Sequence, residues 1–439
     1  MGGLGDPLFN NGLDVGGFVI LLVRVLVGFG ALLISVVLMI WFERKVISDM
    51  QNRIGPNRAG PFGLLQTFAD GTKLIFKEDL LPERADRFVY KLAPFLAVLP
   101  AFAIFTVVPI GGVVDLAHHV VELQIADPPI GILLVLAFSS IAVYGVMLAG
   151  WSSGSKYPLL GSVRASAQMI SYEAAMGLAV VTVILESHGL STRAIVESQA
   201  TAWYHWNVLR LGVVPAAMFF IAMTAELNRP PFDLAEGESE LGGGFHTEYS
   251  AFRFATFYLA EFMNTVTFSA IMVTLFFGGP DGPGFHIPHV YWLFPILWFI
   301  GKTVVFCYIQ VWIRAALPRL RYDQLMDLGW KWLIPLSLAW MLVVAGALEG
   351  VAWMFGVIGG CLLLALVLWR AAVVSKQRRI DRGEGLPLGR PFLLPPVPPQ
   401  PPGPPAAGRP LEHLAAGAQA RAAGAAELRR VESPGKVGG

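Results

Sequence analysis

Long apolar stretches separated by short polar connections dominate the chain from residue 16 to residue 374. A helix needs roughly 20 apolar residues to cross about 30 Å of hydrocarbon, so each stretch predicts a membrane span. The nine predicted spans have approximate limits 16–42, 93–109, 130–151, 165–185, 211–227, 251–277, 291–313, 332–348 and 351–374. The pattern predicts an all-α fold, a polytopic membrane helix bundle of about nine transmembrane helices.

Lysine and arginine gather in every second connection along the chain. The connections in between contain only two basic residues, Arg193 and Arg210. Basic residues mark the cytoplasmic side of a membrane protein, so we expect the N-terminus to lie outside. The predicted organisation is a transmembrane domain over residues 1–374 with cytoplasmic loops at 43–92, 152–164, 228–250 and 314–331. Residues 375–439 become rich in Pro, Ala and Gly, which predicts a disordered cytoplasmic tail without a core.

The overall composition supports a membrane location and excludes some functions. The chain is 55% hydrophobic and 14% charged, with a mean hydropathy of +0.60, whereas average soluble chains carry about 25% charged residues. A net charge of +1 argues against a nucleic-acid partner, which normally needs a clustered basic face. Cys307 and Cys361 stand alone in apolar runs without the spacing of a zinc or iron–sulfur site, so we expect no metal and no covalently bound cofactor.

The first basic loop opens with ERKVISDMQNRIGPNRAGPFGLLQTFADGTKLIFKED, in which prolines and glycines predict a shaped turn. From Gly63 onward, apolar residues recur near helical spacing and polar residues interrupt them. This pattern predicts an amphipathic helix in the membrane interface. A basic anchor at the cytoplasmic face would explain the Lys and Arg residues equally well, but it leaves Asp70 in the middle of the helix unexplained.

Carboxylates within or beside the predicted spans are the second feature that needs an explanation. Glu173 and Glu261 lie inside spans, and Glu226 and Glu248 lie at their cytoplasmic ends. An ionisable residue at a helix centre costs roughly 2.5–3.5 kcal/mol on insertion scales. A protonated glutamic acid in a helix–helix hydrogen bond is the structural alternative. Carboxylates gathered in low dielectric cannot all ionise together, so such a set can pass protons.

Several segments, in order along the chain, together resemble the H-type membrane subunits of bacterial NADH-quinone oxidoreductase (respiratory complex I), a family whose mitochondrial counterpart is NADH dehydrogenase subunit 1. The matching pieces are ERK, QNRIGPNRAGPFGLLQTFADGTKLIFKE, SKYPLLGSVRASAQMISYE, AELNRPPFDLAEGESEL, TEYS, LAEF, WIR and PRLRYDQLMDLGWK. They cover residues from about 43 to 335. The family fold has eight conserved spans, so the ninth would be a C-terminal addition.

The resemblance implies a membrane component of a proton-translocating NADH:quinone oxidoreductase of the bacterial inner membrane, which couples quinone reduction to proton pumping. The implied partners are the quinone substrate, lipid, the quinone-site and iron–sulfur subunits of the hydrophilic arm, and the small and antiporter-like membrane subunits. Carried over by position, the quinone-binding residues are Glu43, Arg44, Arg53, Asp70, Phe232, Glu236, Glu238 and Arg314. The implied proton path comprises Glu173, Glu226, Glu240, Glu248 and Glu261.

Two local expectations concern the loop after the fifth span. Asp233 and Glu236 after two prolines predict a capping box that opens a short helix. The family usually has a bulkier residue after SEL, whereas this chain reads SELGGGFH, which should make the loop more mobile.

Three other functions compete with this interpretation. The anchor of a membrane-bound hydrogenase shares the GPN loop and the acidic spans. A free-standing ion transporter usually shows paired repeats with broken helices, and no internal repeat is visible here. A purely structural anchor gains nothing from Glu173 and Glu261. The chain has no dinucleotide-binding or cluster-binding motif, so we expect it to depend on other subunits for the oxidation of NADH.

Overall fold

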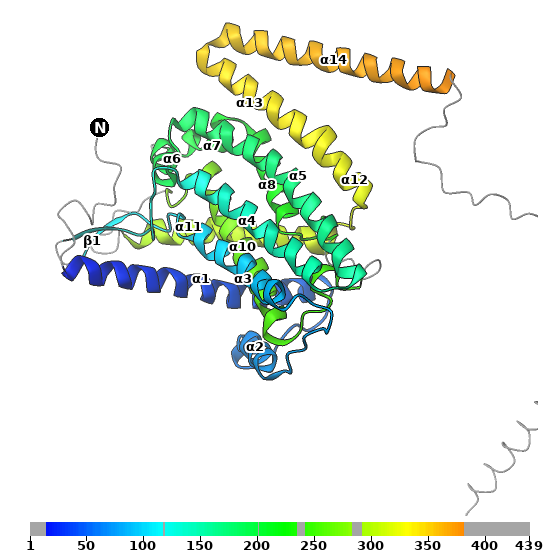
Figure 1. The fold of residues 1–439 in the computed structure, drawn as a ribbon. Helices are drawn as coiled ribbons and strands as arrows, with labels where there is room; N and C mark the ends of the chain where they lie inside the picture. The colour runs from blue at the N-terminus through cyan, green and yellow to red at the C-terminus, as the bar shows by residue number, and fades with distance from the viewer. Residues whose placement is uncertain (1–14, 117–118, 201, 235–241, 283–291, 382–439) are drawn as a thin grey trace, which may run out of the picture. The chain divides into compact units, whose positions relative to one another are not determined.

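Helices form nearly all of the regular structure in this computed structural model, which describes residues 15–116, 119–200, 202–234, 242–282 and 292–381 (Figure 1). The α-helices are α1 Val15–Met50, α2 Gln66–Phe76, α3 Arg87–Phe105, α4 Gly131–Ser152, α5 Lys156–Ser187, α6 Thr192–Gln199, α7 Asn207–Arg210, α8 Val213–Glu226, α10 Ala251–Phe276, α11 Leu293–Ala316, α12 Tyr322–Asp327, α13 Ile334–Glu349 and α14 Val351–Asp381. Short helical turns are η2 Pro61–Gly63, η3 Trp203–His205, η4 Gly244–His246 and η5 Leu328–Leu333.

Apolar helices lie at all nine predicted span positions. Among the described residues, seven helical segments are long and apolar enough to cross a membrane, and two shorter apolar helices lie at Val213–Glu226 and Val351–Val367. The prediction of an all-helical, polytopic membrane protein is therefore confirmed. The N-terminal side and the cytoplasmic assignment of the loops stay predictions.

Several helices extend well beyond the predicted span limits. The 36 residues of α1 make a helix of about 54 Å at roughly 1.5 Å per residue, longer than the hydrocarbon layer. The predicted loops 43–92 and 152–164 are thus partly helical, because α1 continues to Met50, α3 begins at Arg87 and α5 begins at Lys156. A hydropathy reading ends a span at its first charged residues, whereas the helical hydrogen bonds continue into the polar region. Asp86 fixes the start of α3 by accepting from the backbone N–H groups of Phe88 and Val89.

One small element was not predicted. Strands β1 Val113–Leu116 and β2 His119–Glu122 pair antiparallel, with Val113 opposite Glu122. The two strands are only four residues each, which is too short for alternation of polar and apolar residues to reveal a strand in the sequence.

The core lies between helices that are mostly neighbours in the sequence. Helix α3 packs on α4, α4 on α5 and α5 on α8, while α10 packs against both α3 and α1. The interior contains fully buried large side chains such as Tyr90, Tyr172, Phe219, Met263 and Phe276. Helix α8 has only 14 residues, about 21 Å at roughly 1.5 Å per residue. Its last residue, Glu226, is only 5% exposed.

Helix α2 is the helix predicted in the first basic loop. Its side chains Phe68, Ile75 and Phe76 are exposed, while Thr67 donates to the carbonyl of Val37 in α1. The helix therefore presents apolar residues on the surface of the chain, as an interfacial helix does. All the residues discussed below belong to the unit Met1–Leu364; a second unit begins at Ala365.

Candidate functional site

A cavity of about 410 Å³ lies at the C-terminal end of α1 and the turn that follows it. Its lining comprises Glu43, Arg44, Ile47, Arg53, Ile54, Gly55 and Pro56. Apolar side chains and a few converging charged groups are typical of a site for a small organic ligand. The structure therefore brings together three of the residues that the resemblance assigned to quinone: Glu43, Arg44 and Arg53. We call this space the α1 cavity.

Asp70 reaches this region through an ion pair. Arg44 Nη1 lies 2.6 Å from Asp70 Oδ2, and Gln66 donates to the other carboxylate oxygen at 3.3 Å. The contact joins α2 to α1, which explains the acidic residue in the middle of an otherwise basic segment. Arg53 donates from Nε to Gln51 at 2.6 Å.

We expect the Arg44–Asp70 pair to contribute little to stability. The two side chains are 47% and 28% exposed, and exposed ion pairs are typically worth about 0.2–1 kcal/mol. In a double-mutant cycle of Arg44→Gln and Asp70→Asn, the coupling free energy from thermal unfolding should stay below about 1 kcal/mol. A larger coupling would mean that the pair holds the fold, and that activity losses at these positions do not report on the cavity.

Glu43 connects the α1 cavity to the interior. Its carboxylate is buried and accepts a hydrogen bond from Arg314, the basic residue in the last turn of α11. The second carboxylate oxygen, Oε2, lies 3.0 Å from Arg229 Nη1. One buried acid from α1 is thus shared between two arginines that come from distant parts of the sequence.

Arg229 is the residue that the sequence interpretation missed. It is 3% exposed, and its Nε donates to Glu261 Oε1 at 3.0 Å while Nη1 pairs with Glu43. The guanidinium also lies 4.7 Å from the ring centroid of Phe262. Burial opposes the charged form, but Glu43 and Glu261 more than offset it and raise the pKa of Arg229 above its usual value. Arg229 therefore remains a buried cation between two carboxylates.

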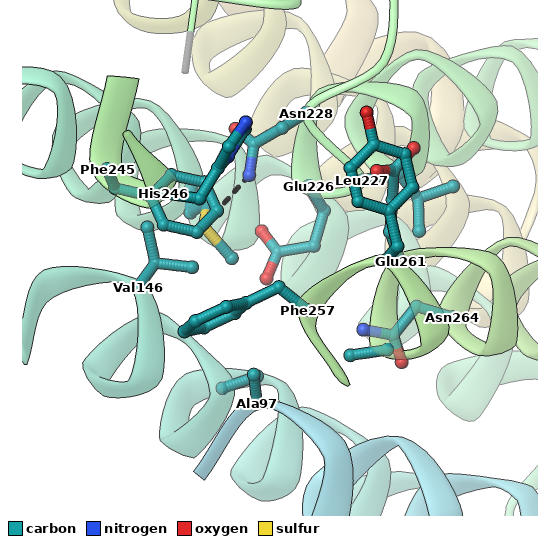
Figure 2. Close-up of a pocket in the computed structure, with 14 residues that line it drawn as sticks. Ala97, Val146, Glu226, Leu227, Asn228, Phe245, His246, Phe257, Glu261 and Asn264 are labelled. Carbon is teal, nitrogen blue, oxygen red and sulfur yellow. Dashed lines mark hydrogen bonds between the residues drawn. The ribbon is translucent and has the colours of Figure 1, made fainter. Parts of the chain in front are cut away.

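Glu261 and Glu226 line a second, smaller cavity of about 70 Å³ (Figure 2). Other polar residues on its wall are Asn228, His246 and Asn264. Because one water needs at least about 10–15 Å³ of such space, this volume accommodates a few water molecules. One carboxylate oxygen of Glu226, Oε2, and Asn264 Oδ1 are buried and have no hydrogen-bond partner among the described residues. We call this space the Glu226 cavity.

Glu173 lies on α5 and does not itself line the Glu226 cavity. Ser140 of α4 donates a hydrogen bond to its carboxylate. The charge of Glu173 acts on Glu226, so the two carboxyl groups are close enough to influence each other. Glu173 thus makes the side-chain hydrogen bond that the structural alternative requires, and it also lies close to one other predicted acid, Glu226.

Glu248 is placed differently from the other predicted acids. It does not line either cavity, and its backbone carbonyl accepts from the Tyr90 hydroxyl at 2.7 Å. Tyr90 and Tyr249 stack with centroids 4.1 Å apart, and the Tyr249 hydroxyl donates to the Tyr90 carbonyl. Burial raises the pKa of Tyr249 to about 12, so its hydroxyl keeps the proton that it donates. These contacts attach the segment around Glu248 to α3.

Phe232 is also away from both cavities. It is buried and lies against Tyr172 with ring centroids 5.5 Å apart, and Gln168 donates to its carbonyl. The following residue, Asp233, pairs with Arg319 at 2.7 Å. Glu236, Glu238 and Glu240 lie outside the described residues, and so does the short helix that a capping box of Asp233 and Glu236 was expected to open.

Glycines allow the following segment to approach α5. A Cβ at Gly161 would stand 2.8 Å from the Cα of Gly244, closer than non-bonded carbons approach. Gly242 and Gly244 have φ values of 70° and 58°, in the region that favours glycine. The glycine run expected to loosen this loop therefore also has a packing role, because it seats η4 on α5.

The fold and the site define a polytopic helical membrane protein in which buried carboxylates and an arginine connect two cavities. The model of the NADH dehydrogenase family matches residues 23–345. The H subunit of NADH-quinone oxidoreductase from Frankia alni is 47% identical over 381 residues, which are 84% of this chain and 83% of the relative. The corresponding protein of Frankia casuarinae is 46% identical over 380 residues, 84% and 83% of the two chains. That of Streptomyces avermitilis is 48% identical over 337 residues, 74% and 72%.

The chain therefore belongs to the family of H-type subunits of the NADH-quinone oxidoreductases. It is a membrane subunit of such an oxidoreductase, and the other subunits of that complex are its partners. This membership favours the oxidoreductase over the hydrogenase anchor, the free-standing transporter and the purely structural anchor.

Proposed function

We propose that this subunit binds the quinone headgroup at the α1 cavity and couples quinone reduction to proton translocation through the buried carboxylates. In this proposal the enzyme lies in the bacterial inner membrane, and lipid surrounds the apolar helices. The cytoplasmic-side loops dock the hydrophilic arm, which delivers electrons from NADH. The quinone substrate enters from the membrane, and no metal or other cofactor is assigned to this chain.

One observation carries the proposal: Arg229 bridges an acid of each cavity. Glu43 lines the α1 cavity, Glu261 lines the Glu226 cavity, and Arg229 lies 3.0 Å from each. At 4 Å, a unit charge is worth about 4 kcal/mol for an effective dielectric constant of 20. A change of charge or protonation beside Glu43 therefore changes the electrostatic interaction between Glu43 and Arg229. We expect this change to alter the proton affinity of Glu261, the acid on the other side of Arg229.

The residues of the α1 cavity suit a quinone and its reduced form. Arginine donors polarise a carbonyl oxygen and stabilise negative charge as it develops on that oxygen. Ile47, Ile54 and Pro56 supply the apolar contacts that an isoprenoid-bearing ring needs. Glu43 is within this lining and already balanced by two arginines, so it can respond to quinone chemistry without leaving an unpaired buried charge.

We expect Arg53→Ala to raise the KM for a short-chain quinone roughly 10-fold or more. A hydrogen bond to a charged donor is worth about 1.5–3 kcal/mol, and about 1.4 kcal/mol corresponds to a tenfold change in affinity. The measurement is NADH:quinone reductase kinetics in membranes, with the amount of assembled complex determined in parallel.

Arg58→Ala is the matched control, because Arg58 is exposed on the same segment but does not line the α1 cavity. It should leave the quinone KM unchanged. An unchanged KM and an unchanged response to quinone-site inhibitors in Arg53→Ala would place the quinone elsewhere.

A further inference from the structure

His246 forms part of the wall of the Glu226 cavity, although the family resemblance gave it no role. It ends the helical turn η4 and lies among the cavity residues with Glu226, Asn228 and Glu261. Figure 2 shows the Glu226 carboxylate directed into the space between His246 and Phe257. His246 is not fully buried, so the ring stands between this space and the surface of the chain at the end of the fold that we expect to be cytoplasmic.

The contacts of the His246 ring are aromatic rather than polar. Phe245, Phe254 and Tyr258 surround it, at ring-centroid distances of 5.0, 5.3 and 6.3 Å. No hydrogen bond from a described residue satisfies its ring nitrogens. The ring is only partly buried and its nitrogens are not among the fully buried, unpartnered polar atoms, so they are open to water.

Water is the partner that fits. Inside the cavity, Glu226 Oε2 and Asn264 Oδ1 are buried polar atoms that lack a partner among the described residues. A buried water typically makes about three hydrogen bonds, and the space of about 70 Å³ accommodates a few such molecules. Glu226 is only 5% exposed and is directed into the cavity, so its carboxyl group and the imidazole share the same small volume.

We propose that His246 is a proton relay between the cytoplasmic-side surface and Glu226, acting through water held in the Glu226 cavity. This inference rests on the proposed function and adds to it the residue through which protons enter the carboxylate set. A phenylalanine would fill the same aromatic surroundings, so the two ring nitrogens are what histidine adds at this position.

The relay step conserves protons. A protonated water (H₃O⁺) on the surface side gives its extra proton to one ring nitrogen and becomes water, and the N–H bond on the other nitrogen breaks and releases its proton to cavity water. That water passes a proton to the Glu226 carboxylate, which becomes a carboxylic acid. The imidazole ends neutral with its tautomer exchanged, and rotation of the ring or the reverse exchange restores it. Burial lowers the pKa of His246 to about 4, so the ring is neutral at pH 7, as a concerted transfer requires.

The test compares His246→Phe, His246→Gln and the matched control His205→Phe in assembled complex reconstituted into proteoliposomes. His205 also lies edge-on to a tyrosine, with centroids 4.6 Å apart, but it does not line the Glu226 cavity. We expect proton translocation and coupled quinone reduction to fall at least fivefold in both His246 variants, with assembly retained. His205→Phe should behave like the wild type.

Other outcomes overturn the relay. Normal proton translocation in His246→Phe would show that the ring serves only packing. A normal His246→Gln with an impaired His246→Phe would show that the residue merely orders water, since an amide does not relay protons. Loss of the assembled complex in both would assign a structural role. Glu226→Gln is measured in parallel to distinguish the His246 relay from the proposed function. If Glu226→Gln is impaired while His246→Phe is normal, the relay is wrong and the proposed function stands.

Discussion

Replacing Arg229 with leucine should destabilise the folded subunit by about 3–5 kcal/mol, the usual cost of leaving a buried charge without its partner. Glu43 keeps Arg314 as a partner, but Glu261 loses its ion pair with Arg229. The variant should therefore show less assembled complex, a lower midpoint of thermal unfolding, and loss of quinone reductase activity beyond the loss of assembly. The measurement is thermal unfolding of the purified complex together with activity per assembled enzyme.

Two further variants make this prediction specific. Arg321→Leu removes an arginine whose side chain is 79% exposed, so it should change stability by less than about 1 kcal/mol. Adding Glu261→Gln to Arg229→Leu removes the stranded charge and should recover most of the lost stability but not the activity. If Arg229→Leu alone assembled normally with full activity, the connection between the two cavities would have no functional role.

The helices could be predicted from the sequence because the membrane requires a long apolar run for each span. Their ends could not, as α1 shows: its helical hydrogen bonds continue to Met50 after the apolar residues end. The β1–β2 hairpin was missed because strands of four residues carry too few positions for a pattern. The fold class therefore follows from composition and periodicity, whereas boundaries depend on local capping, as Asp86 does at α3.

Some residues of the candidate site could also be predicted from the sequence, and others could not. Glu173 and Glu261 could be singled out because charge inside a span is costly, and the roles of Glu43, Arg44 and Arg53 came from the resemblance. The bridge itself could not be predicted, because Arg229 looked like one more basic residue at a cytoplasmic end. Only the packing of α1, α10 and the segment after α8 brings Glu43, Glu261 and Arg229 together. A lone arginine in an acidic segment, directly after an apolar helix, was the available signal.

Glu226→Gln should abolish most proton translocation while leaving the subunit folded. Glutamine keeps the volume and the hydrogen-bonding capacity of the side chain, but its amide cannot take up and release a proton as a carboxyl group does. Among the described residues no cation pairs with Glu226, and its Oε2 has no hydrogen-bond partner. Replacing this unpaired buried carboxyl group by an amide of similar size should therefore not cost stability. In a tightly coupled enzyme, quinone reduction should fall together with proton translocation, by at least tenfold.

The most direct test of the coupling proposal is a parallel recording of NADH-to-quinone electron transfer and proton translocation in proteoliposomes, with wild type and Glu226→Gln at equal amounts of assembled complex. Glu197→Gln is the control, because this glutamate is 63% exposed and lies in neither cavity. We predict that both rates fall together in Glu226→Gln and remain normal in Glu197→Gln. Normal electron transfer with a normal number of protons per quinone in Glu226→Gln would contradict the proposal that buried carboxylates carry the coupling.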